Sequence, residues 1–492
     1  MPQAFTPVAS VPVDPRTARV HEEGWQSWSP SGSYALDDAP HRPTNANWAT
    51  VCYRPGRTAA PAGFQGEGLL ALDPGDGSPV RLWAAPDPAV SVPSIRLTVH
   101  SRTAAPAGFQ GEGLLALDPG DGSPVRLWAA PDPTVSVPSI RLAVHDGRAE
   151  VSADGPVTES SYSGPDGVQG ALAAWADALA TPAPRPAPTV WCSWYEYFTA
   201  VTEDDIHENL RAMDTLDLPV DVVQIDDGYQ SALGDWLTLS GRFRSRAALA
   251  DAIRERGRRA GIWTAPFLVA PHSELAGRHP DWLVRDPAGA PLHAGHNWNH
   301  DLYTLDATHP EARAYLTDVY ATLRAEGYDY FKTDFLYAGA LDGVRHSGAD
   351  ALTAYRAGIA LIREAIGPDA HLLGCGAPIL PSIGLFDAMR VSPDTAPHRR
   401  PEADDYSQPG QEAAEFTGAG RQWQHRRLWI NDPDCLMARP AVETRERWAD
   451  HVEATDGLMA SSDRLLSLDA WGVATTRRLL SPGHAPAPGG AA

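Results

Sequence analysis

Cysteine is scarce in this 492-residue sequence, which contains only four. The four lie far apart, at Cys52, Cys192, Cys375 and Cys435, and no CxxC pair occurs. A disulfide framework and a structural zinc site both need closely spaced cysteines, so the sequence predicts neither of them. We expect no bound metal and no cofactor.

Long apolar runs are also missing. No stretch approaches the length of a membrane-spanning helix, and residues 1–20 contain neither a basic leader nor an apolar run of signal length. These absences predict a cytoplasmic protein without a membrane partner.

Positive charge is in deficit, because 40 Lys and Arg stand against 62 Asp and Glu, a formal net charge of −22. Such a balance excludes nucleic acid as an expected partner. The length predicts two or three domains, and the possibility of a homo-oligomer is left open. Tryptophan, by contrast, is abundant at 16 residues, and flat indole rings suit sugar faces as well as protein cores.

Residues 1–180 are rich in Gly, Pro, Asp and Ser and contain short apolar runs such as GLLAL and VRLWAA between turn signals. This pattern predicts an N-terminal antiparallel β-sandwich. Near its start, Trp25 and Trp28 stand in the polar loop HEEGWQSWSPSG. Two Trp in such a loop more often form a packing cluster than a ligand platform, and the sequence does not decide which of them reaches a binding site.

The same region contains a tandem duplication. Residues 57–100 are repeated as residues 102–145, and only Ala89/Thr134 and Thr98/Ala143 differ. Solenoid repeats diverge on their surfaces and come in threes or more, so two near-identical copies do not indicate a repeat architecture. One copy of these strands is surplus to a sandwich, and we expect it to lie at a sheet edge or outside the sheets.

The sequence changes character after the Pro-rich linker 181–188. Over residues 189–470, eight strand-like runs alternate with helical ones, which predicts an α/β fold with a (β/α)8 TIM-barrel catalytic domain. The insertion after the third strand, around residues 272–310, is a candidate loop over the active face. Residues 471–492 are expected to form a truncated C-terminal tail.

The stretch YDYFKTDFLY, residues 328–337, is typical of a buried strand. Lys332 and Asp334 point to the same face because side chains alternate along a strand. Two charges on a buried strand are costly unless they are paired or used, so a structural ion pair and a catalytic pair are both open interpretations.

Other predicted strand ends repeat this pattern of polar side chains. The residues at these ends are Trp194, Asp226, Asp227, Lys332, Asp334, Cys375, Arg390, Asp394, Asp432 and Asp434. Catalytic residues of such barrels sit at the carboxyl ends of strands, and carboxylates that converge there without metal-ligand spacing suit glycoside hydrolysis by two acids. Asp334 beside Lys332 should be ionised, whereas Asp394, further from Lys332 and next to Pro393, could hold a proton.

Several of these residues also have a structural interpretation. Asp226 and Asp227 point to opposite sides if the strand continues through them, so one of them could brace a loop. Cys375 could be a small buried hydrophobe, and Asp432 with Asp434 could form a turn. His296 and His300 have an i, i+4 spacing, but Gly295 and the neighbouring Asn and Trp residues favour a loop over a metal-binding helix.

The motifs GWQSWS, CSWYEYF, QIDDGYQ, FKTDF, LLGCGAP, MRVSPD, INDPD and ASSD, in this order, resemble the α-galactosidases of glycoside hydrolase family 36, which are related to family 27. The resemblance implies a retaining exo-α-galactosidase acting on galactosides such as melibiose or raffinose. It also implies that Asp334 is the nucleophile and Asp394 the acid/base.

The resemblance assigns the remaining candidates to the substrate. Asp226 and Asp227 would hold the 4- and 6-hydroxyls of galactose, and the apolar edge of the sugar would rest on Trp194. Further contacts are implied for Lys332, Arg390, Cys375 and one of Trp25 and Trp28. Family members usually carry a C-terminal β domain, which this sequence lacks room for after ASSD.

Two other functions compete with this one. A galactosyltransferase of the raffinose-synthase type uses the same two carboxylates and differs in whether water or a sugar resolves the intermediate. A non-catalytic carbohydrate-binding protein belongs to another class, but it has no need of two acids such as Asp334 and Asp394.

Overall fold

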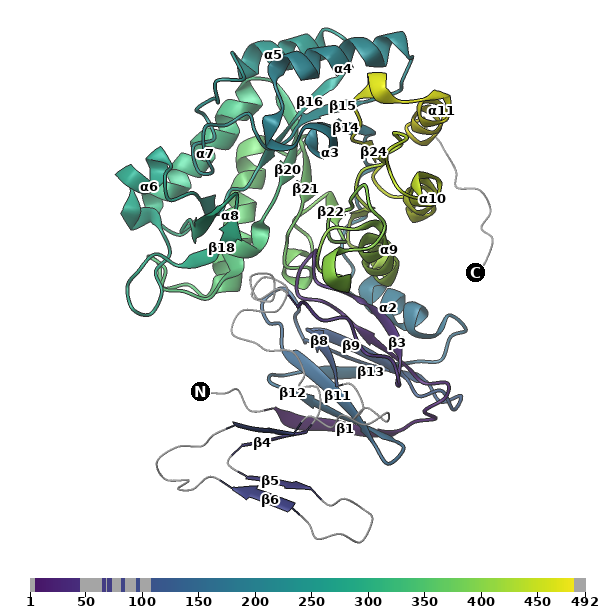
Figure 1. The fold of residues 1–492 in the computed structure, drawn as a ribbon. Coiled ribbons are helices and arrows are strands. Elements are labelled where there is room, and N and C mark those ends of the chain that lie inside the picture. The colour runs from purple at the N-terminus through teal and green to yellow at the C-terminus, as the bar shows by residue number, and fades with distance from the viewer. Residues whose placement is uncertain are drawn as a thin grey trace.

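The computed structural model describes residues 5–44 and 108–481, together with the backbone of four short strands between these ranges. The C-terminal half of the chain forms an α/β domain, and the N-terminal region forms a pair of antiparallel sheets (Figure 1). No helix among the described residues is both long and apolar enough to cross a membrane.

The α/β domain is built on a curled sheet of eight parallel strands in the order β23-β22-β21-β20-β16-β15-β14-β24. The strands are β14 (Val190–Cys192), β15 (Val222–Ile225), β16 (Arg259–Thr264), β20 (Tyr328–Thr333), β21 (His371–Gly374), β22 (Ala388–Arg390), β23 (Ile430–Asp432) and β24 (Ala460–Ser461). The N–H of Leu458 donates to the carbonyl of Asn431 at 2.8 Å and that of Leu436 to the carbonyl of Ala460 at 2.7 Å, which links the two ends of the sheet. The predicted TIM-like barrel is therefore confirmed.

Helices surround this sheet (Figure 1). They are α4 (Glu203–Thr215), α5 (Arg246–Arg254), α7 (Pro310–Ala325), α8 (Ala351–Ile366), α9 (Gln411–Gly420), α10 (Arg445–Thr455) and α11 (Ala470–Leu479). The first begins at Thr202, whose hydroxyl accepts from the N–H of Asp205 while the Asp205 carboxylate accepts from the N–H of Thr202. This capping box satisfies N–H groups that have no partner within the helix.

The insertion after the third barrel strand contains regular secondary structure, so it is only in part the loop that was predicted. It contains α6 (Glu274–Arg278), β18 (His293–Asn297) and β19 (His300–Thr304), and the two strands form a small antiparallel sheet with β17 (Leu268–Val269), which precedes the insertion. His296 and His300 lie on facing strands of a hairpin, joined by Trp298 and Asn299 with φ angles of 50° and 62°. Two successive left-handed residues give the turn that matches strand twist, and this local requirement overrides the loop-like composition.

The N-terminal sheets have the orders β1-β12-β11-β8 and β13-β10-β9-β2-β3. Their strands are β1 (Thr6–Pro12), β2 (Arg19–Glu22), β3 (Gly32–Ala35), β8 (Phe109–Glu112), β9 (Leu114–Asp118), β10 (Val125–Ala129), β11 (Ser139–His145), β12 (Arg148–Ala153) and β13 (Thr158–Tyr162). Buried residues of both sheets, such as Leu117 and Leu142, belong to one hydrophobic core. The antiparallel prediction is thus confirmed, and their arrangement as a sandwich stays a prediction.

The duplicated segment enters these sheets through its second copy, which supplies β8, β9, β10 and β11. The first copy contributes β4 (Phe64–Glu67), β5 (Leu69–Leu72), β6 (Arg81–Ala84) and β7 (Ser94–Leu97), which pair as β4-β7 and β5-β6. The register is the same in both copies, because Phe64 pairs with Leu97 as Phe109 pairs with Leu142. The rest of the first copy lies outside the described residues, so its predicted surplus role stays a prediction.

The two copies allow a matched test of which one builds the core. Phe109 is 0% exposed, and truncating a buried Phe typically costs about 3–5 kcal/mol, so we expect Phe109→Ala to lower the free energy of unfolding by that amount. If the first copy is surplus to the sheets, as its sequence predicts, the equivalent Phe64→Ala should change the free energy of unfolding by less than about 0.5 kcal/mol. Denaturant unfolding of both variants measures the difference. Equal destabilisation by the two substitutions would contradict the assignment of the core to the second copy.

Candidate active site

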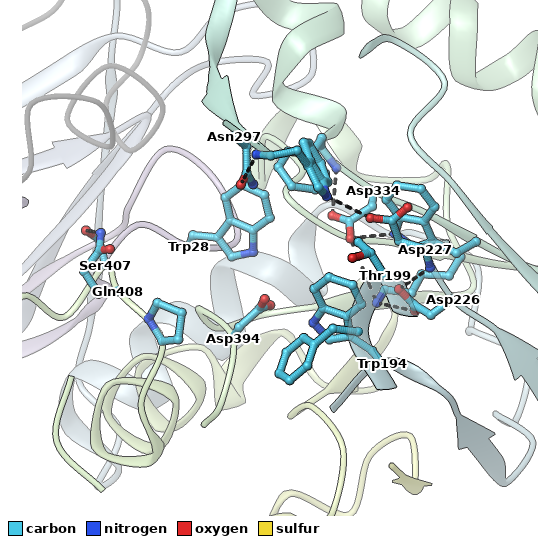
Figure 2. Close-up of a pocket in the computed structure, with 16 residues that line it drawn as sticks. Trp28, Trp194, Thr199, Asp226, Asp227, Asn297, Asp334, Asp394, Ser407 and Gln408 are labelled. Carbon is cyan, nitrogen blue, oxygen red and sulfur yellow. Dashed lines mark hydrogen bonds and ion pairs between the residues drawn. The ribbon is translucent and has the colours of Figure 1, made fainter. Parts of the chain in front are cut away.

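A pocket of about 430 Å³ opens at the carboxyl ends of the barrel strands (Figure 2). Its walls are formed by Trp28, Trp194, Phe198, Thr199, Asp226, Asp227, Trp263, Asn297, Trp298, Lys332, Asp334, Phe335, Asp394, Ser407, Gln408 and Pro409. The structure therefore brings seven of the ten predicted site residues together around one cavity. The three that do not line it are Trp25, Cys375 and Arg390.

Asp334 directly follows β20, and donors face both oxygens of its carboxylate. The indole Nε1 of Trp263 donates to Oδ2 at 3.0 Å, and the N–H of Phe335 donates to Oδ1 at 2.7 Å. Lys332 Nζ lies 3.9 Å from Oδ2. This arrangement suits a carboxylate anion, because hydrogen bonds to the charged form and a nearby cation both favour it.

Lys332 makes its closer ion pair with Asp226, whose Oδ2 lies 3.0 Å from Nζ. Gln224 Nε2 donates to the same oxygen at 2.6 Å, and the N–H of Asp227 donates to Oδ1 at 2.9 Å. Lys332 is thus paired with Asp226 and also lies in the pocket wall, which agrees with the structural interpretation, and its functional role stays a prediction.

Asp227 lines the pocket as Asp226 does, so the two adjacent aspartates do not point to opposite sides as they would on a continuous strand. Both residues lie beyond Ile225, the last residue of β15, where the strand alternation no longer applies. Gln230 Nε2 donates to Asp227 Oδ1 at 2.6 Å, and Trp298 Nε1 donates to Oδ2 at 2.9 Å. Burial nevertheless raises the pKa of Asp227 to about 6.

Arg390, at the end of β22, holds three carboxylates with one guanidinium. Nη1 lies 3.2 Å from Asp394 Oδ1, Nε 3.1 Å from Asp432 Oδ2, and Nη2 2.8 Å from Asp434 Oδ1. Desolvation in the pocket wall and the negative charge of Asp434 raise the pKa of Asp394 to about 7, although Arg390 opposes the shift. Asp432 and Asp434 flank Pro433 and contact Arg390, which agrees with their structural interpretation.

Trp28 reaches the pocket because the N-terminal loop docks on the barrel through a buried ion pair. Arg421 Nε lies 2.7 Å from Glu23 Oε1, and both side chains are 0% exposed. Arg421 also donates to the carbonyls of Gln26 at 3.0 Å and Ser27 at 2.8 Å, which fixes the loop just before Trp28.

The Trp28 ring then packs edge-on against Phe335, with 5.0 Å between ring centroids. It also lies over Gly376, where φ is 53° and an added Cβ would come within 2.9 Å of the indole. Trp25 is 2% exposed and packs in the same hydrophobic core as Trp28, but it does not line the pocket. The loop therefore contains one packing Trp and one pocket Trp.

Cys375 is 1% exposed and directly follows β21, and burial raises the pKa of its thiol well above the usual range. Its N–H donates to the carbonyl of Thr333 at 2.8 Å, in line with a small buried residue.

Sequence reasoning missed Trp298, which the hairpin of the insertion brings to Asp227. The sequence feature that could have predicted this hairpin is the Trp between two Asn in HNWNH, because Asn adopts the left-handed turn conformation readily. Phe198, Thr199, Trp263 and the segment 407–409 were also missed, because nothing local distinguishes them from packing residues. Within the described residues, no group of three or more His, Cys, Asp or Glu side chains could hold a metal ion.

Comparison with known proteins agrees with this geometry. A sequence model of the melibiase family matches residues 183–355. The structure of TtGalA, an α-galactosidase from Thermus thermophilus in complex with p-nitrophenyl α-D-galactopyranoside, is 31% identical with a TM-score of 0.73. The alignment covers 97% of this chain and 89% of that one.

The chain belongs to the GH36 α-galactosidase family. A second GH36 structure, AgaA from Geobacillus stearothermophilus, has a TM-score of 0.59 at 14% identity, which shows a shared fold. It aligns over 96% of this chain and 61% of AgaA. Among curated relatives, AgaSK from Mediterraneibacter gnavus is 29% identical over 169 residues, which are 31% of this chain and 17% of AgaSK. The chain thus matches only a small fraction of that GH36 relative's length.

The raised pKa of Asp227 predicts a stability penalty above pH 6. Unfolded, this carboxyl ionises near 3.8, whereas folded it keeps its proton up to about 6, so the free energy of unfolding falls as pH rises between these values. Asp227→Asn removes the cost of ionising this buried carboxyl, which is about 1.4 kcal/mol for each unit of the pKa shift, but it weakens a hydrogen bond worth about 1 kcal/mol. The variant should therefore be more stable than the wild type at pH 8 by about 2 kcal/mol. The gain should vanish near pH 4.

Asp387→Asn is the matched control in this denaturation series. Burial acts against ionisation there too, but Arg363, at 2.7 Å from Oδ2, lowers the pKa of Asp387 below its usual value. Its replacement should therefore destabilise the protein at pH 8. Asp227→Asn contradicts the account if it destabilises the protein at pH 8 as the control does.

Proposed function

We propose that this chain is a retaining exo-α-galactosidase that hydrolyses terminal α-galactosides by double displacement. The observation that carries the proposal is the pairing of Asp334 and Asp394 in one pocket with different surroundings. Asp334 faces N–H donors and a cation, which suits an ionised nucleophile, whereas the pKa of Asp394 is raised to about 7, which suits an acid at neutral pH.

The proposed reaction has two steps. First, an Asp334 oxygen attacks the anomeric carbon while Asp394 gives its proton to the glycosidic oxygen, so that the C–O bond breaks and the aglycone leaves as an alcohol. Asp394, now ionised, then takes a proton from water as the water oxygen attacks the anomeric carbon. The bond to Asp334 breaks and galactose leaves with its α configuration retained.

The pocket supports binding of one terminal sugar. We assign Asp226 and Asp227 to the 4- and 6-hydroxyls of galactose, Lys332 to a neighbouring hydroxyl, and Trp194 and Trp28 to apolar faces of the sugar. Arg390 and Cys375 lie outside the pocket lining, so we assign them to holding the strand ends rather than to sugar contact.

The aglycone would extend past Asp394, because this residue must reach the glycosidic oxygen. In Figure 2 Asp394 is drawn between Ser407 and Gln408 on one side and the aspartates of the pocket base on the other. Related structures are described in complex with stachyose and with raffinose, so we propose α-galactosyl oligosaccharides as the substrate class. Transfer to a sugar instead of water, and binding without catalysis, are less favoured.

Early-product NMR tests this function directly. Wild-type protein is incubated with p-nitrophenyl α-galactoside, and the anomeric proton of released galactose is followed before mutarotation. We expect hydrolysis with α-galactose formed first. Release of β-galactose would exclude Asp334 as a nucleophile, and absence of any hydrolysis by folded protein would support a binding protein instead.

Replacing the two acids should separate their roles. Asp334→Ala should abolish turnover of every galactoside, because each substrate needs the nucleophile, and azide should restore turnover with a β-galactosyl azide product. Asp394→Ala should slow raffinose hydrolysis by about 10²–10⁴-fold but p-nitrophenyl galactoside cleavage far less, because nitrophenolate leaves without a proton. Equal losses for both substrates in Asp394→Ala would count against the acid assignment.

A further inference from the structure

The carboxylates around Arg390 outnumber its charge. Asp432 is 1% exposed and Asp434 is 0% exposed, whereas a third of the Asp394 side chain is open to the pocket. One guanidinium neutralises one of these three carboxylates, and a buried excess of negative charge is costly. The three carboxyls of Asp394, Asp432 and Asp434 should therefore share at least one proton at neutral pH.

The hydrogen bonds show which carboxyl is held most firmly as an anion. Asp434 accepts from Arg390, from the Tyr195 hydroxyl, from the N–H of Thr395 at 2.8 Å and from the N–H of Cys435 at 2.7 Å. Among the residues that the structure describes, Asp394 accepts a side-chain or N–H hydrogen bond from Arg390 alone. Donors favour the charged form, so the negative charge is best satisfied on Asp434.

Asp432 comes between these two cases. It accepts from Arg390 Nε at 3.1 Å and from the N–H of Asp434 at 2.9 Å. The other titratable groups that act on Asp394 or Asp434 are Asp334, Lys332, Tyr195 and Cys435. Among the described residues, Lys332 forms ion pairs with Asp226 at 3.0 Å and Asp334 at 3.9 Å and with none of the three carboxylates around Arg390.

We propose that Asp434 is a positioning residue for the acid/base step. Its ionised carboxylate pairs with Arg390, so the proton that the three carboxyls share stays on Asp394. Tyr195, from α3 (Trp194–Tyr197), supports it by donating its hydroxyl proton to Asp434. The proposal rests on the proposed role of Asp394 as the acid/base. It goes further by naming the group that keeps this acid protonated.

The isosteric variant Asp434→Asn tests the proposal. It removes one of the two competing charges, so Arg390 pairs only with Asp432 and Asp394 and favours the ionised form of Asp394 more strongly. We expect the alkaline limb of kcat/KM for raffinose to move about one pH unit or more to lower pH, with the acidic limb unchanged. The rate for p-nitrophenyl galactoside at the same pH should fall much less, because its leaving group needs no proton.

Two further variants guard against a purely structural effect. Tyr195→Phe removes the hydrogen bond from the Tyr195 hydroxyl to the Asp434 anion, so the shared proton lies on Asp434 for a larger fraction of the time. The alkaline limb of kcat/KM should then move to lower pH by a smaller amount than in Asp434→Asn. Asp463→Asn is the control, since Asp463 is 0% exposed and bonds Arg439 Nη1 at 2.8 Å on a neighbouring strand end. It should leave the alkaline limb of the pH profile at the wild-type position.

The outcomes are distinguishable from failure of the function itself. If wild-type protein shows a bell-shaped profile but neither Asp434→Asn nor Tyr195→Phe moves its alkaline limb, the positioning role is overturned while the galactosidase function stands. A uniform loss for both substrates at all pH values would likewise overturn it. If Asp434→Asn does not fold, Tyr195→Phe alone decides.

Discussion

The shortage of positive charge at the mouth of the barrel is the constraint on which the site depends. Lys332 and Arg390 are the cations that the described residues place against the carboxyls of Asp226, Asp334, Asp394, Asp432 and Asp434, and the buried carboxyl of Asp227 lies in the same pocket. Burial raises the pKa values of Asp227 and Asp394, neighbouring carboxylates raise them further, and there are too few cations nearby to offset these effects. A two-acid mechanism needs such an uneven distribution of protons.

The pocket also depends on a contact between the two halves of the chain. The Glu23–Arg421 ion pair is fully buried, and removing one partner of such a pair typically costs about 3–5 kcal/mol, so it strongly restrains the N-terminal loop. Through this loop Trp28 joins a site whose acids all come from the barrel. The N-terminal region thus supplies one side chain of the pocket wall as well as a buried contact with the barrel.

The barrel and most of the site could be predicted from sequence because each polar residue follows its own strand. Buried runs such as VDVVQI and YDYF define the strands, and parallel strands bring Asp226, Asp334 and Asp394 to one edge. Other features depend on contacts between distant segments. The choice of Trp28 over Trp25 and the sharing of Arg390 among three carboxylates leave no local pattern. The hairpin that carries Trp298 is indicated only by the two Asn residues of HNWNH, and the turn after Ile225 breaks the alternation assumed for Asp227.

The most direct test of this account is a ¹³C NMR titration of the aspartate carboxyls in wild-type protein and in Asp394→Asn. The account predicts a carboxyl in the wild type that titrates near pH 7 and is absent from the variant. A wild-type spectrum in which no carboxyl titrates above pH 6, or a pH 7 titration that persists in Asp394→Asn, would contradict it.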